Sequence, residues 1–475
     1  MDVDSPTIPK QTWRLRPAER RSTLFFGDLL VAVLALLVAL YFWSQGGEWY
    51  KFSWAFLQER VPFWFYLLPV FWLLLLTESY NPRRSTIRME TIREITIAVF
   101  VCSGLYLILF FFSAPFSLPR RGVAGFIASV YLLTLIWRLG YIQLFTAPLF
   151  LRRILIVGAG QAGTQLTKII KDIWPPPFFL VGLVDDDPEK IGKEIEGFPV
   201  LGGSDHLFDI VSEHQVSDLV FAISGEMKNK MFERLLEAEE KGVEVTTMPT
   251  MYEELLGRIP IFQLQSDWVL RSFVDHAHIS GFYDLGKRLI DIVGGIVGVL
   301  LLVLTFPLIA LLIWLNSGVP IFYKQVRLGK NGRSFSIIKY RTMVKDAERD
   351  GIPRTTEEND SRLTKIGKIL RKTHLDELPQ FLNILRGDMS LVGPRSERPE
   401  LVDMYQHIIP FYRARLFVKP GLTGWAQVNY GYASNIDENA EKLEFDLFYI
   451  KRRNLFLDLQ IMVRTLGTVI GFKGR

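Results

Sequence analysis

Long apolar segments constrain this chain more than any other feature, because about 20 apolar residues in a row can cross a lipid bilayer as a helix. Four such segments precede residue 150, at residues 24–42, 63–77, 95–112 and 123–141. The first is not a cleaved signal peptide, since its apolar run is too long and has no small-residue cleavage site. Residues 1–150 are therefore expected to form a membrane α-helical bundle of four spans.

Basic residues predict how this bundle is oriented. They gather before the first segment, between the second and third, and after the fourth: Arg14, Arg16, Arg20, Arg21, Arg83, Arg84, Arg88, Arg93, Arg152 and Arg153. Lys and Arg are retained on the cytoplasmic side, so both ends of the bundle should face the cytoplasm. Few polar groups apart from Asp28 lie inside the segments, which favours an anchor over a transport path.

Composition excludes several classes of protein. The single cysteine, Cys102, cannot form an intramolecular disulfide, and the six histidines are too scattered for a zinc site. The net charge is only +5, and much of the basic character lies near apolar segments. Anionic lipids and phosphorylated substrates are therefore expected as partners, and nucleic acid is not.

Residues 151–275 predict a Rossmann-like α/β domain. An apolar strand, a turn with Gly158, Gly160 and Gly163, and a helix follow one another, as in a dinucleotide-binding motif. Asp185 ends the next predicted strand, where a dinucleotide site places its ribose-binding acid. The motif indicates the fold more strongly than it indicates chemistry. The domain could bind a nucleotide or dinucleotide, or could keep the fold for packing alone.

The apolar run at residues 289–315 is long enough to cross a bilayer at ~40 Å, yet it contains Pro307. Basic residues flank both of its ends: Lys287, Arg288, Lys324 and Arg327. Positive charge on both sides favours two cytoplasmic ends, so we expect a re-entrant helix at residues 286–316 that breaks at Pro307. A kinked full span is the alternative, and it would place the rest of the chain outside the cell.

The sequence after this run predicts a β-hairpin, because Asn331-Gly332 is a strong two-residue turn signal between β-rich runs. Lys339 and Arg341 alternate on the second strand, so they project from the same face. They lie close in sequence to the segment described next.

Two adjacent carboxylates, Asp376 and Glu377, precede an apolar run at helical spacing. Pro379 fits only in a first helical turn, so the acids should sit at a helix start, where negative charge is favoured. Cations surround them in sequence: Arg371, Lys372, Arg386, Arg395 and Arg398. Such an Asp stays ionised, available as a nucleophile or metal ligand. Alternatively the acids only stabilise the helix, with Thr373 and Asp376 as a variant capping box.

At this point the chain resembles a known family, the polyprenyl-phosphate hexose-1-phosphate transferases, which are large bacterial monotopic phosphoglycosyl transferases. The resemblance is carried by ordered motifs, which are KRLID, GVPIFYKQVRLG, FSIIKYRTM, LRKTHLDELPQFLNILRGDMSLVGPR and KPGLTGWAQVN. It implies a third, α/β monotopic catalytic domain at residues 276–475 whose re-entrant helix seats the active site at the cytoplasmic interface. It also implies a homodimer in the bacterial inner membrane.

The resemblance implies a reaction and residue roles. Hexose 1-phosphate, glucose or galactose, would pass from a UDP-sugar to undecaprenyl phosphate, releasing UMP, as the first membrane step of exopolysaccharide, capsule or O-antigen synthesis. Asp376 would be the nucleophile, forming a covalent phospho-sugar intermediate. Glu377 would assist the polyprenyl phosphate as a base, and Mg²⁺ would bind at the pair. The chemistry of the residues agrees, since arginines and a metal let two phosphates meet. We expect Arg371, Arg395, Lys339, Arg341 and Asp446 to bind phosphate or substrate.

Two other functions stay open from the sequence. One is a membrane-anchored nucleotide-sugar oxidoreductase or dehydratase, which would need a Tyr-x-x-x-Lys pair. Tyr283 and Lys287 have that spacing but introduce the apolar run, so we regard the pair as coincidental. The other is a non-catalytic membrane scaffold. Residues 429–432 and the segment after Arg395 look variable, so the sugar is left undetermined.

Overall fold

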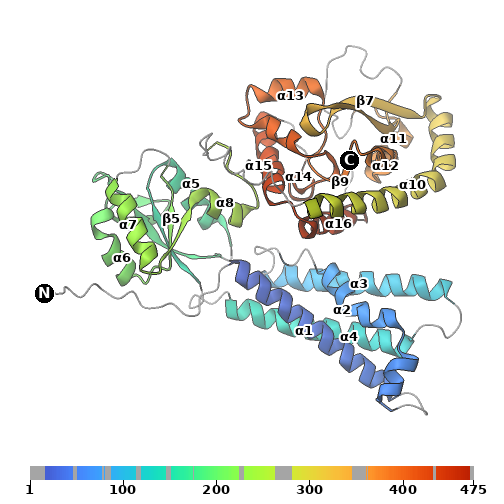
Figure 1. Cartoon of the computed structure of the whole chain (residues 1–475), viewed down its shortest axis with the longest axis horizontal. Coiled ribbons are helices and arrows are strands. Elements are labelled where there is room, and N and C mark those ends of the chain that lie inside the picture. Colours follow the sequence, from blue (N-terminus) through green and yellow to red (C-terminus); the bar gives the residue numbers. More distant parts are fainter. Residues whose placement is uncertain are drawn as a thin grey trace. The chain divides into compact units, whose positions relative to one another are not determined.

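The computed structural model describes residues 17–45, 51–76, 80, 87–113, 119–145, 151–174, 176–223, 229–262, 281–344, 360, 362–431 and 435–470. The chain divides into two compact units, Met1–Glu254 and Leu255–Arg475 (Figure 1). Some residues named above lie outside the described residues, namely Arg14, Arg16, Arg83, Arg84, Tyr432 and residues 263–275.

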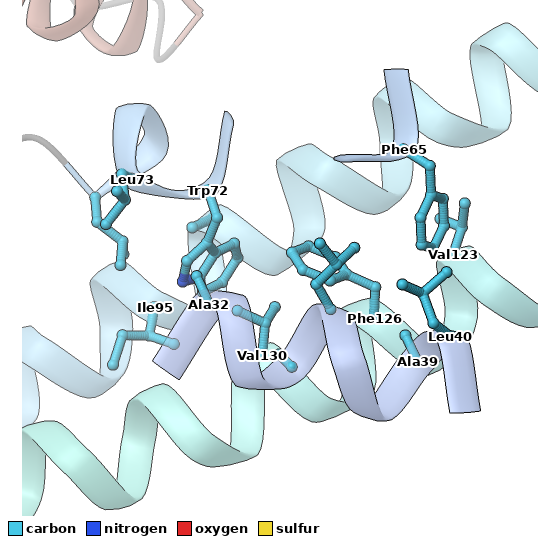
Figure 2. Close-up of a cluster of buried hydrophobic side chains, with 14 of the residues drawn as sticks. Ala32, Ala39, Leu40, Phe65, Trp72, Leu73, Ile95, Val123, Phe126 and Val130 are labelled. Carbon is cyan, nitrogen blue, oxygen red and sulfur yellow. The ribbon is translucent and has the colours of Figure 1, made fainter. Parts of the chain in front are cut away.

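The first unit begins with the predicted apolar helices. They are α1 (Pro17–Ser44), η1 (Phe56–Arg60), η2 (Phe63–Leu67), α2 (Leu68–Leu75), α3 (Arg88–Phe112) and α4 (Arg120–Phe145). Their core is apolar and aromatic, and Figure 2 shows Phe65, Trp72 and Phe126 pointing into it among the helices. Helices α1, α3 and α4 are long and apolar enough to cross a membrane.

The second predicted span is shorter than the other apolar helices of this unit. Its helix covers only Phe63–Leu75, which at 1.5 Å per residue is about 20 Å, less than the ~30 Å hydrocarbon core. The helix begins where the predicted segment at residues 63–77 begins, because the extended backbone of Pro62 (ψ 146°) separates η2 from η1. The predicted apolar helix is thus present, but the described part of it is too short for a straight span, so the second span stays a prediction.

A buried ion pair joins α1 to α4. The guanidinium of Arg138 donates to both carboxylate oxygens of Asp28, at 3.1 and 2.6 Å. The side chains are only 1% and 0% exposed. The sequence analysis noted Asp28 but missed Arg138, although an acid inside a membrane segment usually pairs with a basic residue of another segment. The pair ties α1 to α4, and the anchor role of this bundle stays a prediction.

A mixed α/β domain follows in the same unit. Its sheet has the order β3-β4-β2-β1-β5-β6, and all neighbours are parallel except β3 and β4. The elements are β1 (Arg153–Val157), α5 (Gln161–Asp172), β2 (Phe179–Val184), β3 (Glu194–Ile195), β4 (Phe198–Gly202), η5 (Ser204–His206), α6 (Leu207–Glu213), β5 (Asp218–Phe221), α7 (Asn229–Glu240), β6 (Glu244–Thr247) and α8 (Met248–Leu256). The order reverses between β1 and β5, where ligands bind in sheets of this kind.

The second unit combines one long apolar helix with short α and β elements. They are α10 (Gly281–Ser317), β7 (Phe322–Leu328), η6 (Lys330–Gly332), β8 (Ser334–Tyr340), α11 (Lys365–Lys372), η7 (Leu375–Glu377), α12 (Gln380–Arg386), β9 (Ser390–Val392), α13 (Pro399–Gln406), η8 (Tyr412–Phe417), β10 (Gly421–Thr423), α14 (Trp425–Asn429), α15 (Ile436–Arg452) and α16 (Leu455–Ile470). The predicted hairpin is confirmed as β7 and β8, with Asn331 and Gly332 at φ 58° and 73°.

Helix α10 packs on the rest of its unit along much of its length. It contacts α11, α12, β9 and α16, while apolar side chains such as Leu300, Val303 and Leu304 stay exposed on its outer side. Pro307 lies inside one continuous helix of 37 residues, so the predicted interruption there is wrong. The ribbon of α10 bends along its course and turns toward β7 (Figure 1). A proline inside a helix removes one helical hydrogen bond and is a usual cause of such a bend.

Candidate active site

The two adjacent acids occupy a single turn between two helices. Helix α11 ends at Lys372 with Thr373 as its C-cap, His374 takes a left-handed conformation (φ 57°), and Asp376 and Glu377 follow in η7. Helix α12 begins at Gln380, so the predicted helix start just after the acids is confirmed. Thr373 donates its hydroxyl to carbonyls of α11, which makes the capping-box alternative wrong.

Glu377 is held by two cations. Lys339 from β8 donates to its Oε1 at 2.6 Å, and Arg395, just after β9, donates to the same oxygen at 3.2 Å. Burial alone would raise the pKa of Glu377, but these two cations outweigh burial and lower it well below its usual range. Glu377 therefore stays ionised and orients both cations beside its neighbour.

Asp376 is buried, at 6% exposure, and no group in the described part of the chain hydrogen-bonds its carboxylate. Burial and the charge of Glu377 raise its pKa, against the opposing charges of Lys339, Arg371 and Arg395. A carboxylate whose ionised form is poorly stabilised is a stronger nucleophile than one held by several donors.

Two of the predicted phosphate-binding residues contact one of these acids, and a third acts on the other through its charge. Lys339 and Arg395 contact Glu377 directly. Arg371 reaches over from α11, where its Nε donates to Thr342 Oγ1 at 3.0 Å. The three come from β8, α11 and the turn after β9, and the charge of each opposes the raised pKa of Asp376.

The other two predicted phosphate-binding residues have different contacts. Arg341 is buried and donates to Ser317 and Gly318 at the end of α10. Asp446 in α15 is 1% exposed and pairs with Arg415 at 2.8 Å; burial raises its pKa although Arg415 opposes this. The carboxylate of Asp446 pairs with Arg415. Arg341 uses its Nη2 at the end of α10, while its Nε and Nη1 have no partner among the described residues. Neither set of contacts tests the phosphate-binding prediction.

Arg415 and Glu397 form an ion pair next to Arg395, and neither residue was predicted from the sequence. Arg415 donates to the carbonyl of Arg395 at 3.2 Å and also pairs with Glu397. Burial opposes ionisation of Glu397, but Lys442, Arg415 and Arg327 outweigh it and lower the pKa of Glu397 to about 2. The only sequence signal for Glu397 was its position two residues after Arg395.

Asn383 in α12 ties this helix to β8. Its side chain accepts from the backbone N–H of Ile338 at 3.2 Å and donates to the carbonyl of Ser336 at 2.9 Å. It is fully buried. These two hydrogen bonds hold β8, which carries Lys339, against α12, which follows the acids. No sequence motif predicted this role of Asn383.

The glycine-rich loop of the first unit has the predicted strand–turn–helix form. Gly158 has a φ of 112°, which glycine tolerates best. A Cβ on Gly163 would lie 1.9 Å from the carbonyl oxygen of Gly158. At Gly160, a Cβ would meet open space. Asp185 lies just past the end of β2 and accepts from the N–H of Ala159 in this loop at 2.7 Å. The predicted residues are thus adjacent, and no ligand is needed for their contact.

Tyr283 and Lys287 both bond Asp458 at 3.0 Å, and all three lie in the second unit. Their hydrogen bonds tie the start of α10 to α16. They belong to a structural contact there, as expected of a coincidental spacing.

Comparisons with known proteins match two regions of this chain to families. Residues 282–472 match the model of the bacterial sugar transferase family, and residues 75–249 match that of a CoA-binding domain. A UDP-N-acetylgalactosamine-undecaprenyl-phosphate N-acetylgalactosaminephosphotransferase of Aeromonas hydrophila is 39% identical over 232 residues, which are 46% of this chain and 55% of that protein. The chain thus spans little more than half of that relative's length.

Two further relatives are covered more fully. The UDP-glucose:undecaprenyl-phosphate glucose-1-phosphate transferase of Caulobacter vibrioides is 39% identical over 39% of this chain and 70% of its own length. The uncharacterized sugar transferase EpsL of Bacillus subtilis is 41% identical over 34% of this chain and 75% of its own length. Since the region of likeness contains the acids and the cations around them, the chain belongs to the bacterial sugar transferase family.

Proposed function

We propose that this protein transfers hexose 1-phosphate from a UDP-sugar to undecaprenyl phosphate, giving undecaprenyl-diphosphate-sugar and UMP. The observation that carries the proposal is the buried Asp376 carboxylate, free of hydrogen bonds from the described residues and surrounded by Lys339, Arg371 and Arg395. Relatives named as sugar-phosphate transferases to undecaprenyl phosphate support it. The product would begin an exopolysaccharide, capsule or O-antigen.

The reaction would proceed in two steps through Asp376. First, a carboxylate oxygen of Asp376 bonds to the sugar-bearing phosphorus of the UDP-sugar, and the bond from that phosphorus to UMP breaks. UMP leaves with the electron pair. Second, a phosphate oxygen of undecaprenyl phosphate bonds to the same phosphorus and displaces the carboxylate. The covalent intermediate lets the soluble donor leave before the lipid reacts.

Glu377 would serve both steps. Before substrate binds it holds Lys339 and Arg395. When substrate phosphates draw these cations away, Glu377 loses the charges that lower its pKa, and it becomes able to accept a proton from undecaprenyl phosphate. A permanently paired Glu377 would be a poor base, so this step depends on the cations moving.

Mg²⁺ fits the donor set at the acids. Among the described residues no group of three or more His, Cys, Asp or Glu could hold a metal alone. Mg²⁺, however, commonly takes one or two carboxylates and completes its shell with water and substrate phosphates. Asp376 has an open carboxylate for this, with Glu377 beside it. When bound, Mg²⁺ would neutralise charge on the pyrophosphate.

The membrane arrangement follows from α10. A straight 37-residue helix would be about 55 Å long, yet its first turns bond Asp458 in α16 and its last residues bond Arg341 after β8. Both ends thus meet the same catalytic unit, which favours a re-entrant helix over a full span. Together with the basic flanks, this supports a catalytic unit on the cytoplasmic face of the bacterial inner membrane. A homodimer and a nucleotide in the Rossmann-like domain are further expectations.

The test is UMP release from a panel of UDP-sugars, with undecaprenyl phosphate and Mg²⁺, by the full chain in lipid nanodiscs. Asp376→Asn is the inactive variant, and Asp284→Asn, an exposed acid of α10, is the matched control. Release by the wild type and the control alone supports the proposal and identifies the sugar. An active Asp376→Asn would exclude the nucleophile role, and no release from any donor would exclude the proposed reaction.

A further inference from the structure

Asp291 is the only ionisable residue in the apolar run at residues 289–315. It lies in the third turn of α10 and is 3% exposed. An acid in such a run is costly to keep, so its partners indicate what it does. Its Oδ1 accepts from the hydroxyl of Ser390 and from the backbone N–H of Leu391, both at 2.9 Å. Both partners belong to β9.

Strand β9 leads directly to the active site. Val392 ends the strand, and Arg395 follows three residues later with its guanidinium on Glu377. On its other edge β9 pairs with β10. The Leu391 N–H points away from that pairing, and Asp291 is its acceptor. The carboxylate of Asp291 therefore sets where β9 lies against α10.

The same stretch of α10 also holds the helix that follows the acids. Arg288, one turn before Asp291, donates to the carbonyls of Ile384 and Leu385 at 2.9 and 2.8 Å, at the C-terminal end of α12. Gly294 packs against Leu391 of β9, and Gly295 packs against Leu385. Helix α10 thus contacts both β9, which precedes Arg395, and α12, which follows Glu377.

We propose that Asp291 is a positioning residue for the transfer reaction, and that it holds β9 so that Arg395 is placed beside Glu377 and Asp376. Arg288 supplies the matching contact to α12. The inference rests on the proposed function for its catalytic consequence. It adds that the placement of the apolar helix sets the geometry of the phosphate-binding arginine.

The experiment compares Asp291→Leu, Asp291→Asn and Asp284→Leu in the full chain in nanodiscs. Asp284→Leu makes the same change at an exposed position of α10. Asn keeps an oxygen that can accept both hydrogen bonds, so Asp291→Asn should stay within about threefold of wild-type turnover, whereas Asp291→Leu should lose at least about tenfold in kcat. Rates are normalised to folded protein.

Hydrogen exchange gives a second readout that needs no substrate. In Asp291→Leu, exchange at residues 390–396 should accelerate while exchange in β8 stays unchanged, and Asp291→Asn should resemble the wild type. Wild-type turnover in Asp291→Leu, lost turnover without faster exchange at 390–396, or equal losses in both variants would each overturn the proposal. A wild type that releases no UMP refutes the proposed function instead, and exchange at Leu391 still decides whether Asp291 holds β9.

Discussion

Gly298 of α10 packs closely against Phe381 of α12, the helix that follows Asp376 and Glu377. A Cβ built on Gly298 would lie 2.1 Å from Cγ of Phe381, whereas ordinary contact begins near 3.4 Å. Gly298→Ala therefore requires α10 and α12 to separate by about 1 Å, or the ring to leave its place. Phe381 is only four residues after Glu377, so the displacement reaches the turn that carries both acids.

The expected cost of Gly298→Ala is about 1–3 kcal/mol of unfolding free energy, the usual range for overpacking a core. Alanine also raises helix propensity by up to ~1 kcal/mol, which reduces the net loss but does not reverse it. In a domain of this size each kcal/mol lowers Tm by about 2–4 °C. We expect UMP release to fall as well, because a 1 Å displacement of catalytic groups is enough to slow a reaction.

The assay measures Tm and UMP release in nanodiscs for Gly298→Ala, Phe381→Ala and the double variant. Phe381→Ala removes the ring, so the added methyl group should cost much less in its presence, and the double-mutant cycle should show a coupling of at least ~1 kcal/mol. Gly104→Ala in α3 is the control, since its Cβ would meet nothing within 4 Å. A stable, active Gly298→Ala, or a cycle without coupling, would refute the close packing argued for α10 and α12.

Three further perturbations test other parts of the structure. Asp28→Leu should destabilise the anchor by about 3–5 kcal/mol, because it leaves Arg138 buried and unpaired, and adding Arg138→Leu should restore most of the loss in a thermal-unfolding assay. Glu397→Gln should lower the free energy of unfolding by ~3 kcal/mol at pH 7. Because the folded pKa of Glu397 is about 2, below its usual range, the stability that its carboxylate provides is full above about pH 4.5 and is lost as pH falls toward 2. The acid-unfolding curves of variant and wild type should therefore converge at low pH. Lys339→Met removes the cation 2.6 Å from Glu377 and should slow UMP release at least about 30-fold; unchanged kinetics would exclude Lys339 from the site.

Local patterns predicted the parts of the site that depend on short stretches of chain. The helix start after Asp376 and Glu377 follows from apolar spacing and Pro379, and the hairpin follows from Asn331-Gly332. That Lys339 and Arg395 would meet at Glu377 could be expected only through the family resemblance, because the three residues come from different elements.

Tertiary contacts decided what local patterns could not. Arg341 was predicted to alternate with Lys339 on one strand, but β8 ends at Tyr340, and Arg341 instead donates to the last residues of α10. The Asp28–Arg138 pair joins residues 110 positions apart. Spacing along the chain does not indicate which buried acid pairs with which buried cation. The ion pair of Arg415 and Glu397 near the site was missed for this reason.

The most direct test of the account is the donor half-reaction without acceptor. Wild-type protein is mixed with its UDP-sugar and Mg²⁺ but no undecaprenyl phosphate, and both released UMP and the intact protein mass are measured. The account predicts a burst of about one UMP per active site, a mass increase of one sugar phosphate on the peptide containing Asp376, and loss of both in Asp376→Asn. UMP release that requires the lipid acceptor, or a modified residue other than Asp376, would contradict it.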